Sequence, residues 1–542
     1  MNRPPDIWNL KAIITDPLEV QVRSERSADF NGVTLLEREV TFRSERWRGQ
    51  EIRIAAHVAM PAGEAKLPAL IIGHGHGGAG SMDMARGYAA AHHLIAVSID
   101  GPGQGDSTGP RDCMGNWLDV LNDPRDSYLY HYAVAGMRAV TYVTRLPECD
   151  PNRVGVTGGS MGGIMTLLVN GVDTRLACAI DNAACGAWAV GAKDASWIRA
   201  LMMEGMGLQV DSPAVATLLR NLDPALYIPT QHSPLLIILG AQDEFFPITS
   251  LAETVADLHG RHRLTYIADW DHGLYTQDNP ALQTYDNTAA ASLRVDGSTK
   301  RWIDYYLHGK GAPIPRAPVL RLRQSGGAVL CRATVDDGTG VKAVRLCYST
   351  DGAYTFDRLA MGGAGSACQE RLSLSPAEGQ RLAAFVEVEW EDGLFLSSRP
   401  VMGPKFRCRV RPAPFNEATY GIERSEESAA QFLETLRADP SLPLDERLWW
   451  KFHLAGMWAG IRRYEKAVEV YQRVLEQAPS QPVDDIVPVT LLSLAQVYVR
   501  QGAKARAIEA LKRALEVWPT TPDAAPKEIE KARALLDTLS SG

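Results

Sequence analysis

The sequence contains no long apolar run. Its first residues, MNRPPDIWNLKAIITDPLE, lack the stretch of about 7 to 15 apolar residues that a signal peptide needs. Nowhere does the chain approach the ~18 consecutive apolar residues of a membrane span. We therefore expect a cytoplasmic protein that does not enter a membrane.

Cysteine pairs at metal-binding or redox spacing are also missing. The eight cysteines are scattered and no C-x-x-C occurs, which excludes a zinc knuckle and a thioredoxin-type motif. Four of them lie between residues 331 and 408 and could pair in an exported protein. Because the chain has no export signal, we expect reduced thiols.

Basic residues form no stripe. The 56 Lys and Arg and the 64 Asp and Glu give a formal charge of −8 that is spread along the chain, so the sequence has no electrostatic footprint for nucleic acid or anionic lipid. The 45% of apolar and 22% of charged residues are those of an ordinary globular protein, and disorder is not indicated. A length of 542 residues, at about 150 per domain, predicts three or four domains.

The first segment, residues 1–312, alternates short apolar runs with helical stretches. This pattern is typical of a mostly parallel sheet with helices on both faces. An antiparallel hairpin is expected first, with strands near 33–42 and 52–60, and about thirty residues precede it. Buried strands are predicted at 69–72, 95–99, 154–157, 177–180, 235–239 and 264–267, and a helix at 127–146.

The second segment, residues 316–410, has a different pattern. Short alternating strands are separated by turns such as DDGTG, TDGAY and EDG. This spacing predicts a β-sandwich of the immunoglobulin or fibronectin kind with about seven strands.

The third segment, residues 417–542, is helical and repetitive. Ala467 and Ala507 are separated by 40 positions, and so are Pro479 and Pro519. Small residues let paired helices approach closely, and the proline ends the second helix of each pair. Because two repeats rarely bury enough surface alone, we expect helices at 426–437 and 527–539 to cap them.

The stretch LIIGHGHGGAG, residues 70–80, fits two templates. As G-x-G-x-x-G after an apolar strand, with Asp100 at the end of the next strand, it is typical of a dinucleotide-binding loop. As His-Gly followed by a glycine-rich turn, it would instead present backbone N–H groups to an oxyanion. The rest of the segment has to decide between these interpretations.

A candidate nucleophile follows the strand at 154–157. Gly158, Ser160 and Gly162 form G-x-S-x-G, a strand-to-helix turn so sharp that the serine backbone is strained. Glycine is needed at both flanking positions because side chains there would strike the neighbouring strand and helix. An apolar strand before the motif and a helix-competent run after it indicate that Ser160 is a nucleophile.

A serine hydroxyl needs a base, and the base needs an acid to orient it. In this kind of fold the chain order is Ser, then Asp or Glu, then His. Asp243 follows the strand at 235–239 and is the predicted acid, with Glu244 as the alternative. His272 follows the strand at 264–267 and is the predicted base. We expect Asp269 and Asp271 to be solvated or to cap the loop, and Glu244, if it is not the acid, to face solvent.

The glycine-rich loop then takes the role of an oxyanion hole. We predict that its two donors are the backbone N–H groups of Met161 and His76. The dinucleotide interpretation would leave the serine, histidine and aspartate unexplained. About fifty residues at 183–233 separate two strands, and we predict that they form a helical cap. Trp188, Met202 and Phe245 are the candidates for its substrate pocket, although plain core packing explains such residues equally well.

With these residues in place, the first segment resembles the α/β-hydrolase superfamily, within the branch of acetyl xylan esterases, dienelactone hydrolases and prolyl oligopeptidases. The resemblance is carried by the His74-Gly75 loop and by DGPGQGDS, DPNRVGVTGGSMGG, GAQDEFFP and DHG, and covers about 300 of the 542 residues. The third segment resembles tetratricopeptide repeats. The fold so implied is an α/β-hydrolase domain followed by a β-sandwich and an all-α repeat domain. The implied activity is two-step acyl transfer on small carboxylic esters, short-chain and acetyl esters among them, with no metal or organic cofactor.

Three hypotheses remain open from the sequence. The first is a serine esterase. The second is a serine peptidase of the prolyl oligopeptidase type, which the short stretch before the first predicted strand disfavours because it leaves no room for a gating propeller. The third is a scaffold with a vestigial hydrolase part, in which the repeats hold a protein partner or a second copy of the chain.

Overall fold

The computed structural model describes two parts of the chain. In the first it describes residues 5–410 apart from 195, 205–207, 259, 273–284, 326–327, 337 and 365–366. In the second it describes 448, 451–452, 455–456, 459, 464–478, 486–520 and 526–541. The chain divides into two compact units, residues 1–413 and 414–542, each of which is described by itself.

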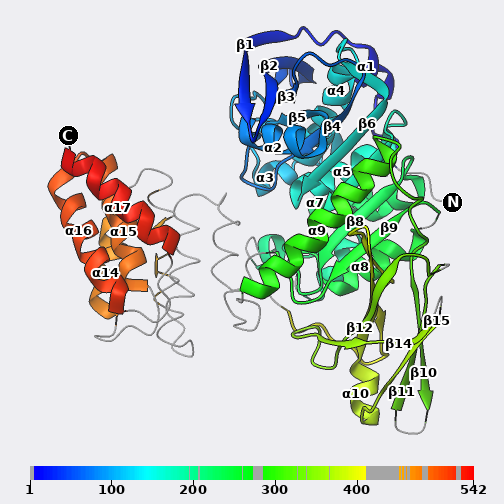
Figure 1. Cartoon of the computed structure of the whole chain (residues 1–542). Helices are drawn as coiled ribbons and strands as arrows, with labels where there is room; N and C mark the ends of the chain where they lie inside the picture. Colours follow the sequence, from blue (N-terminus) through cyan, green and yellow to red (C-terminus); the bar gives the residue numbers. More distant parts are fainter. Residues whose placement is uncertain are drawn as a thin grey trace. The chain divides into compact units, whose positions relative to one another are not determined.

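A mixed sheet organises the first unit (Figure 1). Among the described strands, nine belong to it, in the order β1-β2-β3-β5-β4-β6-β7-β8-β9. Their bounds are β1 (Gln21–Phe30), β2 (Val33–Trp47), β3 (Gln50–Pro61), β4 (Leu67–Gly73), β5 (Ile95–Ile99), β6 (Cys149–Gly159), β7 (Cys178–Asn182), β8 (Leu235–Gly240) and β9 (Arg263–Ile267). From β5 to β9 all neighbours are parallel, whereas β1, β2 and β3 are antiparallel. The six predicted buried strands and the predicted hairpin are therefore all present.

Strand β1 was not predicted from the sequence. All ten of its residues are exposed or only partly buried, so its sequence QVRSERSADF shows no apolar alternation. It pairs along most of its length with β2 and is held there by backbone bonds. The first strand thus begins at Gln21, earlier than the predicted hairpin.

Helices cover both faces of the sheet, as predicted. On one face α4 (Tyr128–Val143) packs against α5 (Met161–Val172), and on the other α2 (Met82–His92) contacts α9 (Tyr285–Tyr306). Every residue of α4 and of α5 is buried, which agrees with the mostly apolar side chains of both helices. This three-layer arrangement is the α/β-hydrolase fold.

The described residues between β7 and β8 include several short helices, and their role as a cap stays a prediction. These helices are α6 (Trp188–Gly191), the π-helix η2 (Ile198–Glu204), α7 (Pro213–Leu222) and the 3-10 helix η3 (Pro224–Thr230). The buried carboxylate of Asp223 joins two of these pieces, since it accepts the backbone N–H groups of Ala187, Trp188 and Ala225.

Two further sheets follow α9 within the first unit. One has the order β10-β11-β15-β14, and the other contains β13-β12-β16-β17 with β18 beside β16. Their inner faces share a core, with Leu320 and Cys331 from the first sheet and Leu346 and Val386 from the second. They therefore form a sandwich. The described strands are β10 (Val319–Ser325), β11 (Ala328–Thr334), β12 (Val341–Ser349), β13 (Asp357–Ala360), β14 (Gly362–Ala364), β15 (Ala367–Leu372), β16 (Ala383–Trp390), β17 (Phe395–Ser397) and β18 (Val401–Met402).

The second unit is helical in its described residues. The helices α14 (Tyr464–Gln477), α15 (Ile486–Arg500), α16 (Lys504–Val517) and α17 (Pro526–Ser541) each contact the next. Ala467, Ala495 and Ala507 are fully buried, which agrees with the small residues that close packing of paired helices requires. The helix predicted at 527–539 lies within α17, whereas the one predicted at 426–437 and Pro479 lie outside the described residues.

Three further features bear on the sequence-based expectations. All eight cysteines lie within the described residues, are buried and form no disulfide. Within the described ranges, no helix combines the length and the apolar character needed to cross a membrane. The same residues contain no group of three or more His, Cys, Asp or Glu side chains that could hold a metal ion.

Candidate active site

Ser160 lies at the sharp turn between β6 and α5. Its backbone has φ 56° and ψ −117°, a strained conformation for a residue with a side chain. A Cβ atom on Gly158 would lie 2.5 Å from the carbonyl oxygen of Gly162, and one on Gly162 would lie 2.5 Å from that of Gly73. Both predicted glycines are thus required by the close approach of backbones, and the turn holds the serine side chain above the sheet.

His272 connects Ser160 to Asp243. The Nε2 atom of His272 lies 2.9 Å from the hydroxyl oxygen of Ser160, and its Nδ1 lies 2.8 Å from Oδ2 of Asp243. Because a carboxylate only accepts, Nδ1 carries the proton of the neutral ring, and Nε2 is left to accept the serine proton. The other carboxylate oxygen of Asp243 accepts the backbone N–H groups of Phe245 and Phe246. The three predicted side chains therefore form one hydrogen-bonded chain at the carboxyl ends of β6, β8 and β9.

Burial and the neighbouring charges shift the pKa of His272 in opposite directions. Burial by itself lowers the pKa of the imidazole, but the charge and hydrogen bond of Asp243, with Glu244 and Asp271, raise the pKa to about 9. The imidazolium is thus strongly favoured beside the buried carboxylate. This stabilises the proton that His272 would receive from Ser160.

Glu244, the alternative acid, has a different place. Its side chain is fully buried, and Oε2 accepts the main-chain N–H of His272 at 3.0 Å. Burial, and then the charge of Asp243, raise the pKa of Glu244 to about 8. The expectation that this side chain faces solvent was wrong, because the histidine loop folds over it. It holds the backbone of that loop and leaves the ring to Asp243.

The glycine-rich loop after β4 lies next to the nucleophile. A Cβ atom on Gly75 would be 3.6 Å from Cβ of Ser160. The ring of His74 donates from Nδ1 to the carbonyl of Gly75 and accepts the N–H of Gly101 at Nε2, so the ring is neutral. Burial accordingly lowers the pKa of His74. The loop thus contacts Ser160 as an oxyanion loop would, and the donor roles of His76 and Met161 stay a prediction.

Asp112 anchors this loop and was not found from the sequence. Its buried carboxylate lies 2.8 Å from Nδ1 of His76 and accepts the N–H of Gly77 at 2.7 Å and the indole N–H of Trp117 at 2.8 Å. Asp112 belongs to an irregular segment after β5, where no periodic pattern marks a residue. Only the folded chain brings it under the loop.

A shallow pocket of about 410 Å³ contains both reacting side chains. In the described residues its lining is Gly75, Gly159, Ser160, Ala183, Trp270, Asp271 and His272. The three predicted pocket residues are not among these. Trp188 packs edge-on against Trp197, Met202 is buried in η2, and the ring of Phe245 lies 5.1 Å from that of His272. Phe245 thus packs against the histidine ring, and a substrate contact of any of the three stays a prediction.

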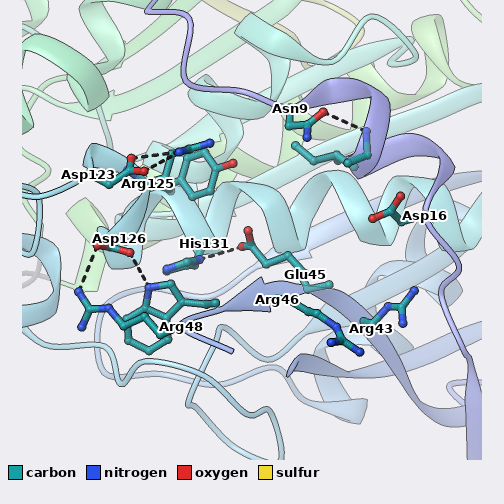
Figure 2. Close-up of a pocket in the computed structure, with 15 residues that line it drawn as sticks. Asn9, Asp16, Arg43, Glu45, Arg46, Arg48, Asp123, Arg125, Asp126 and His131 are labelled. Carbon is teal, nitrogen blue, oxygen red and sulfur yellow. Dashed lines mark hydrogen bonds and ion pairs between the residues drawn. The ribbon is translucent and has the colours of Figure 1, made fainter. Parts of the chain in front are cut away.

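A second pocket, of about 490 Å³, lies between α1 (Leu10–Thr15), β2 and the start of α4 (Figure 2). Its charged side chains mostly bind one another or a neighbour at the rim. The pairs are Arg48 with Asp126, Arg125 with Asp123, His131 with Glu45, and Arg43 with Glu19. Among them, the pair of His131 and Glu45 joins α4 to β2, and the pair of Arg48 and Asp126 joins the turn between β2 and β3 to the residues just before α4. Together the four pairs account for most of the charge in this pocket.

Family comparisons agree with the fold and with the repeats. Residues 12–183 match the family model of acetyl xylan esterase, residues 136–290 that of the prolyl oligopeptidase family, and residues 418–482 that of a tetratricopeptide repeat. Acetyl esterase Axe7A of Xylanibacter ruminicola is 40% identical over 68 residues, which are 12% of this chain and 16% of that protein. The uncharacterized peptidase YuxL of Bacillus subtilis is 30% identical over 142 residues, 26% of this chain and 21% of that protein. The chain thus matches about a fifth or less of the length of these relatives.

Two solved structures align with about half of this chain. The acetyl xylan esterase from Paenibacillus sp. R4 has a TM-score of 0.42 at 21% identity and covers 56% of this chain and 98% of its own. Acetyl xylan esterase 1 from Thermoanaerobacterium sp. JW/SL YS485 has a TM-score of 0.39 at 20% identity and covers 52% of this chain and 96% of its own. The sheet and the elbow give the chain an α/β-hydrolase-like fold, and its sequence is similar to the acetyl xylan esterase and prolyl oligopeptidase families over residues 12–183 and 136–290 and to a tetratricopeptide repeat over residues 418–482.

Proposed function

We propose that the protein is a serine hydrolase that cleaves carboxylic esters through an acyl-enzyme. The observation that carries the proposal is the continuous hydrogen-bonded chain from Ser160 through His272 to Asp243, with the serine and histidine opening into one pocket. A buried aspartate that orients an imidazole against a serine hydroxyl is the arrangement that makes such a hydroxyl nucleophilic.

The proposed reaction has two steps. His272 takes the hydroxyl proton at Nε2 as the Ser160 oxygen attacks the ester carbonyl, and the imidazolium then gives that proton to the leaving alcohol. Water, deprotonated by the same nitrogen, hydrolyses the acyl-serine and releases the acid. The backbone N–H groups of Met161 and His76 stabilise the oxyanion in both steps, and loss of such a donor typically costs about 10² to 10³ in rate.

Short-chain esters, acetyl esters among them, are the proposed substrates. The pocket beside the nucleophile is shallow, and its lining includes the small residues Gly75, Gly159 and Ala183 as well as Trp270 and Asp271. The match of residues 12–183 to the acetyl xylan esterase family supports the same choice. No residue in the proposed reaction requires a metal or an organic cofactor.

A serine peptidase is the second candidate, because residues 136–290 match the prolyl oligopeptidase family. The experiment that separates the candidates compares wild-type protein with Ser160→Ala on p-nitrophenyl esters of two to eight carbons and on a panel of peptide amides. Ester turnover that falls with chain length and is lost in the variant supports the proposal. Amide cleavage without ester preference supports the peptidase, and an inert wild-type protein supports a scaffold with a vestigial hydrolase part.

We also propose that the helical repeats hold a protein partner or a second copy of this chain. The tetratricopeptide match at 418–482 and the successive packed helices from α14 to α17 support an interaction role. Light scattering of the full chain at about 1 to 100 µM tests self-association. If the repeats hold a second copy, the measured molecular mass should rise with protein concentration.

A further inference from the structure

The strand that leads to the proposed base is an edge strand. β9 ends the nine-stranded order, and the five residues after it run to His272. An uncovered edge strand exposes unpaired backbone groups. Here the sandwich covers it through side chains: the hydroxyl of Thr265 donates to the carbonyl of Phe395 at 2.6 Å, and the N–H of Tyr266 donates to the hydroxyl of Ser397 at 2.9 Å.

Aromatic packing extends the same contact. The ring of Tyr266 lies 4.8 Å from the ring of Phe385 in the sandwich. The ring of Phe356, also in the sandwich, lies 5.6 Å from the same Phe385 ring. The hydroxyl of Ser298 in α9, the helix after the histidine loop, also donates to the carbonyl of Phe395 at 3.0 Å. The sandwich therefore contacts the elements on both sides of the histidine loop along the chain.

The loop itself is held by one arginine of the sandwich. Arg358, on β13, places Nη1 2.9 Å from Oδ2 of Asp269 and donates from Nη2 to the carbonyl of Ala268 at 2.6 Å. The N–H of Phe356 donates to Oδ1 of the same aspartate at 3.3 Å. Asp269 was expected to be solvated or to cap its loop, but it is mostly buried, with 16% of its side chain exposed.

Asp269 also contacts the loop that carries the proposed acid. Gln242, the residue before Asp243, donates from Nε2 to Oδ1 of Asp269 at 3.2 Å and accepts the N–H of Trp270 at Oε1. The backbone of Asp269 has φ 56°, which a residue with a side chain adopts only when its surroundings impose it. This carboxylate therefore joins the sandwich, the acid loop and the base loop at a strained point of the chain.

We infer that Arg358 is a positioning residue for His272 that acts through Asp269, so that the sandwich is part of the hydrolytic machinery. The inference rests on the proposed function, since it assigns the sandwich a role in that same site. The guanidinium is suited to this because its planar fork binds a carboxylate and a carbonyl at the same time, and an ammonium cannot reproduce that geometry. Burial raises the pKa of Asp269, and the charge of Arg358 acts in the opposite direction.

The test uses Arg358→Gln, Arg358→Lys and Asp269→Asn in the full chain. A fluorophosphonate phosphonylates Ser160, and the reaction is taken to its end point. The amount of label then gives the number of folded sites, and kcat is expressed per labelled site. We expect kcat per site on p-nitrophenyl acetate to fall by about 10- to 100-fold in Arg358→Gln, with KM changed less than about threefold, because the base is displaced while the pocket remains. The lysine variant should recover part of the loss, and adding Asp269→Asn to Arg358→Gln should cost little more.

The matched control is Arg323→Gln, which removes an exposed arginine from β10 in the other sheet of the sandwich. It should leave kcat per site within twofold of wild type. Hydrogen exchange of the peptide from 264 to 272 gives a readout that needs no turnover. Its amides should exchange faster in Arg358→Gln, while the peptide from 67 to 75 in β4 and the oxyanion loop is unchanged.

The outcomes separate the two proposals. If wild-type protein has no Ser160-dependent hydrolysis but the 264–272 peptide loosens, the proposed function fails while the sandwich still positions the loop. If wild type is active and Arg358→Gln keeps its kcat per site, or loses activity only in proportion to titratable sites, the positioning role is overturned. An exchange rate of the 264–272 peptide equal to that of wild type overturns it as well.

Discussion

Glu244 accepts the main-chain N–H of His272 at 3.0 Å, while the preceding residue, Asp243, binds the ring of the same histidine at 2.8 Å. Two adjacent carboxylates thus hold one histidine at two points, one at its backbone and one at its ring. Glu244 sets the position of the histidine loop, and Asp243 sets the orientation and the charge of the ring.

Glu244→Gln is expected to shift the pH profile of the enzyme. Burial lowers the pKa of His272, but Asp243 and, more weakly, Glu244 raise it, to about 9 in total. The general base works only when neutral, so activity falls as the pH drops through this pKa. Glutamine keeps an acceptor for the loop and removes the charge. The acidic limb of kcat/KM, measured from pH 5 to 10, should therefore move to lower pH by up to about one unit.

Glu253→Gln provides the control for charge, because Glu253 is an exposed carboxylate on α8 (Ile248–Thr254). The acidic limb of its kcat/KM profile should coincide with that of the wild-type protein. A limb in Glu244→Gln that stays in place, or that moves to higher pH, contradicts the proposed electrostatic role of Glu244.

Asp112→Ala is expected to loosen the oxyanion loop. The substitution removes the acceptor of Gly77 N–H and of the Trp117 indole and the partner of the His76 ring. Because buried donors without acceptors are costly, we expect a loss of about 2 to 3 kcal/mol in the free energy of unfolding and a fall in kcat of about 10-fold or more. Urea unfolding and ester kinetics measure the two effects. Unchanged kcat with reduced stability would mean that the loop keeps its shape without this anchor.

Gly158→Ala and Gly159→Ala form a matched pair at the nucleophile turn. An added Cβ meets the carbonyl oxygen of Gly162 at 2.5 Å in the first variant and only the carbonyl oxygen of Asn182 at 3.9 Å in the second. We expect Gly158→Ala to lose about 1 to 3 kcal/mol of stability, since backbone has to move, and Gly159→Ala to unfold within about 0.5 kcal/mol of wild type. Thermal unfolding of both variants checks this, and equal losses would show that the steric argument is wrong.

Arg294→Met is expected to destabilise the contact between α9 and the sandwich. Arg294 binds Glu387 with Nε 2.5 Å from Oε2, and the side chains are 9% and 1% exposed. Removing one partner of a buried pair leaves an undercompensated charge and costs about 3 kcal/mol or more, although Arg345 still binds Glu387 at 3.0 Å.

The control on the same helix is Lys300→Met, which breaks an exposed pair with Asp304 four residues along. Such pairs contribute about 0 to 1 kcal/mol. Denaturant unfolding of the two variants should therefore differ by at least about 2 kcal/mol. Similar midpoints in both would mean that Arg345 compensates fully for the loss.

Local pattern was sufficient for most of the fold and for the three central residues. The strands before Ser160, Asp243 and His272 are buried and apolar, and glycine or loop residues follow each of them, so their order and their place at strand ends could be predicted. β1 could not, because both of its faces are accessible to solvent and its side chains carry no period. Its place depends on backbone pairing with β2, which no single residue of β1 signals.

The residues that support the site could not be predicted from the sequence. Asp112 is separated from Gly77 by 35 positions, and Phe356 from Asp269 by 87, and nothing in either local stretch indicates the partner. The position of Glu244 beside Asp243 suggested a rival acid. Only the path of the loop decides that one carboxylate meets the ring and the other meets the backbone.

The sequence by itself determined the order of strands and helices and the candidates for nucleophile, base and acid, because hydrophobic periodicity and turn chemistry act between residues close along the chain. The tertiary structure alone decided which carboxylate binds the ring of His272, that Asp112 anchors the glycine-rich loop, and that the sandwich contacts the histidine loop. These depend on distances between segments far apart in the sequence, which only the packing of the layers sets.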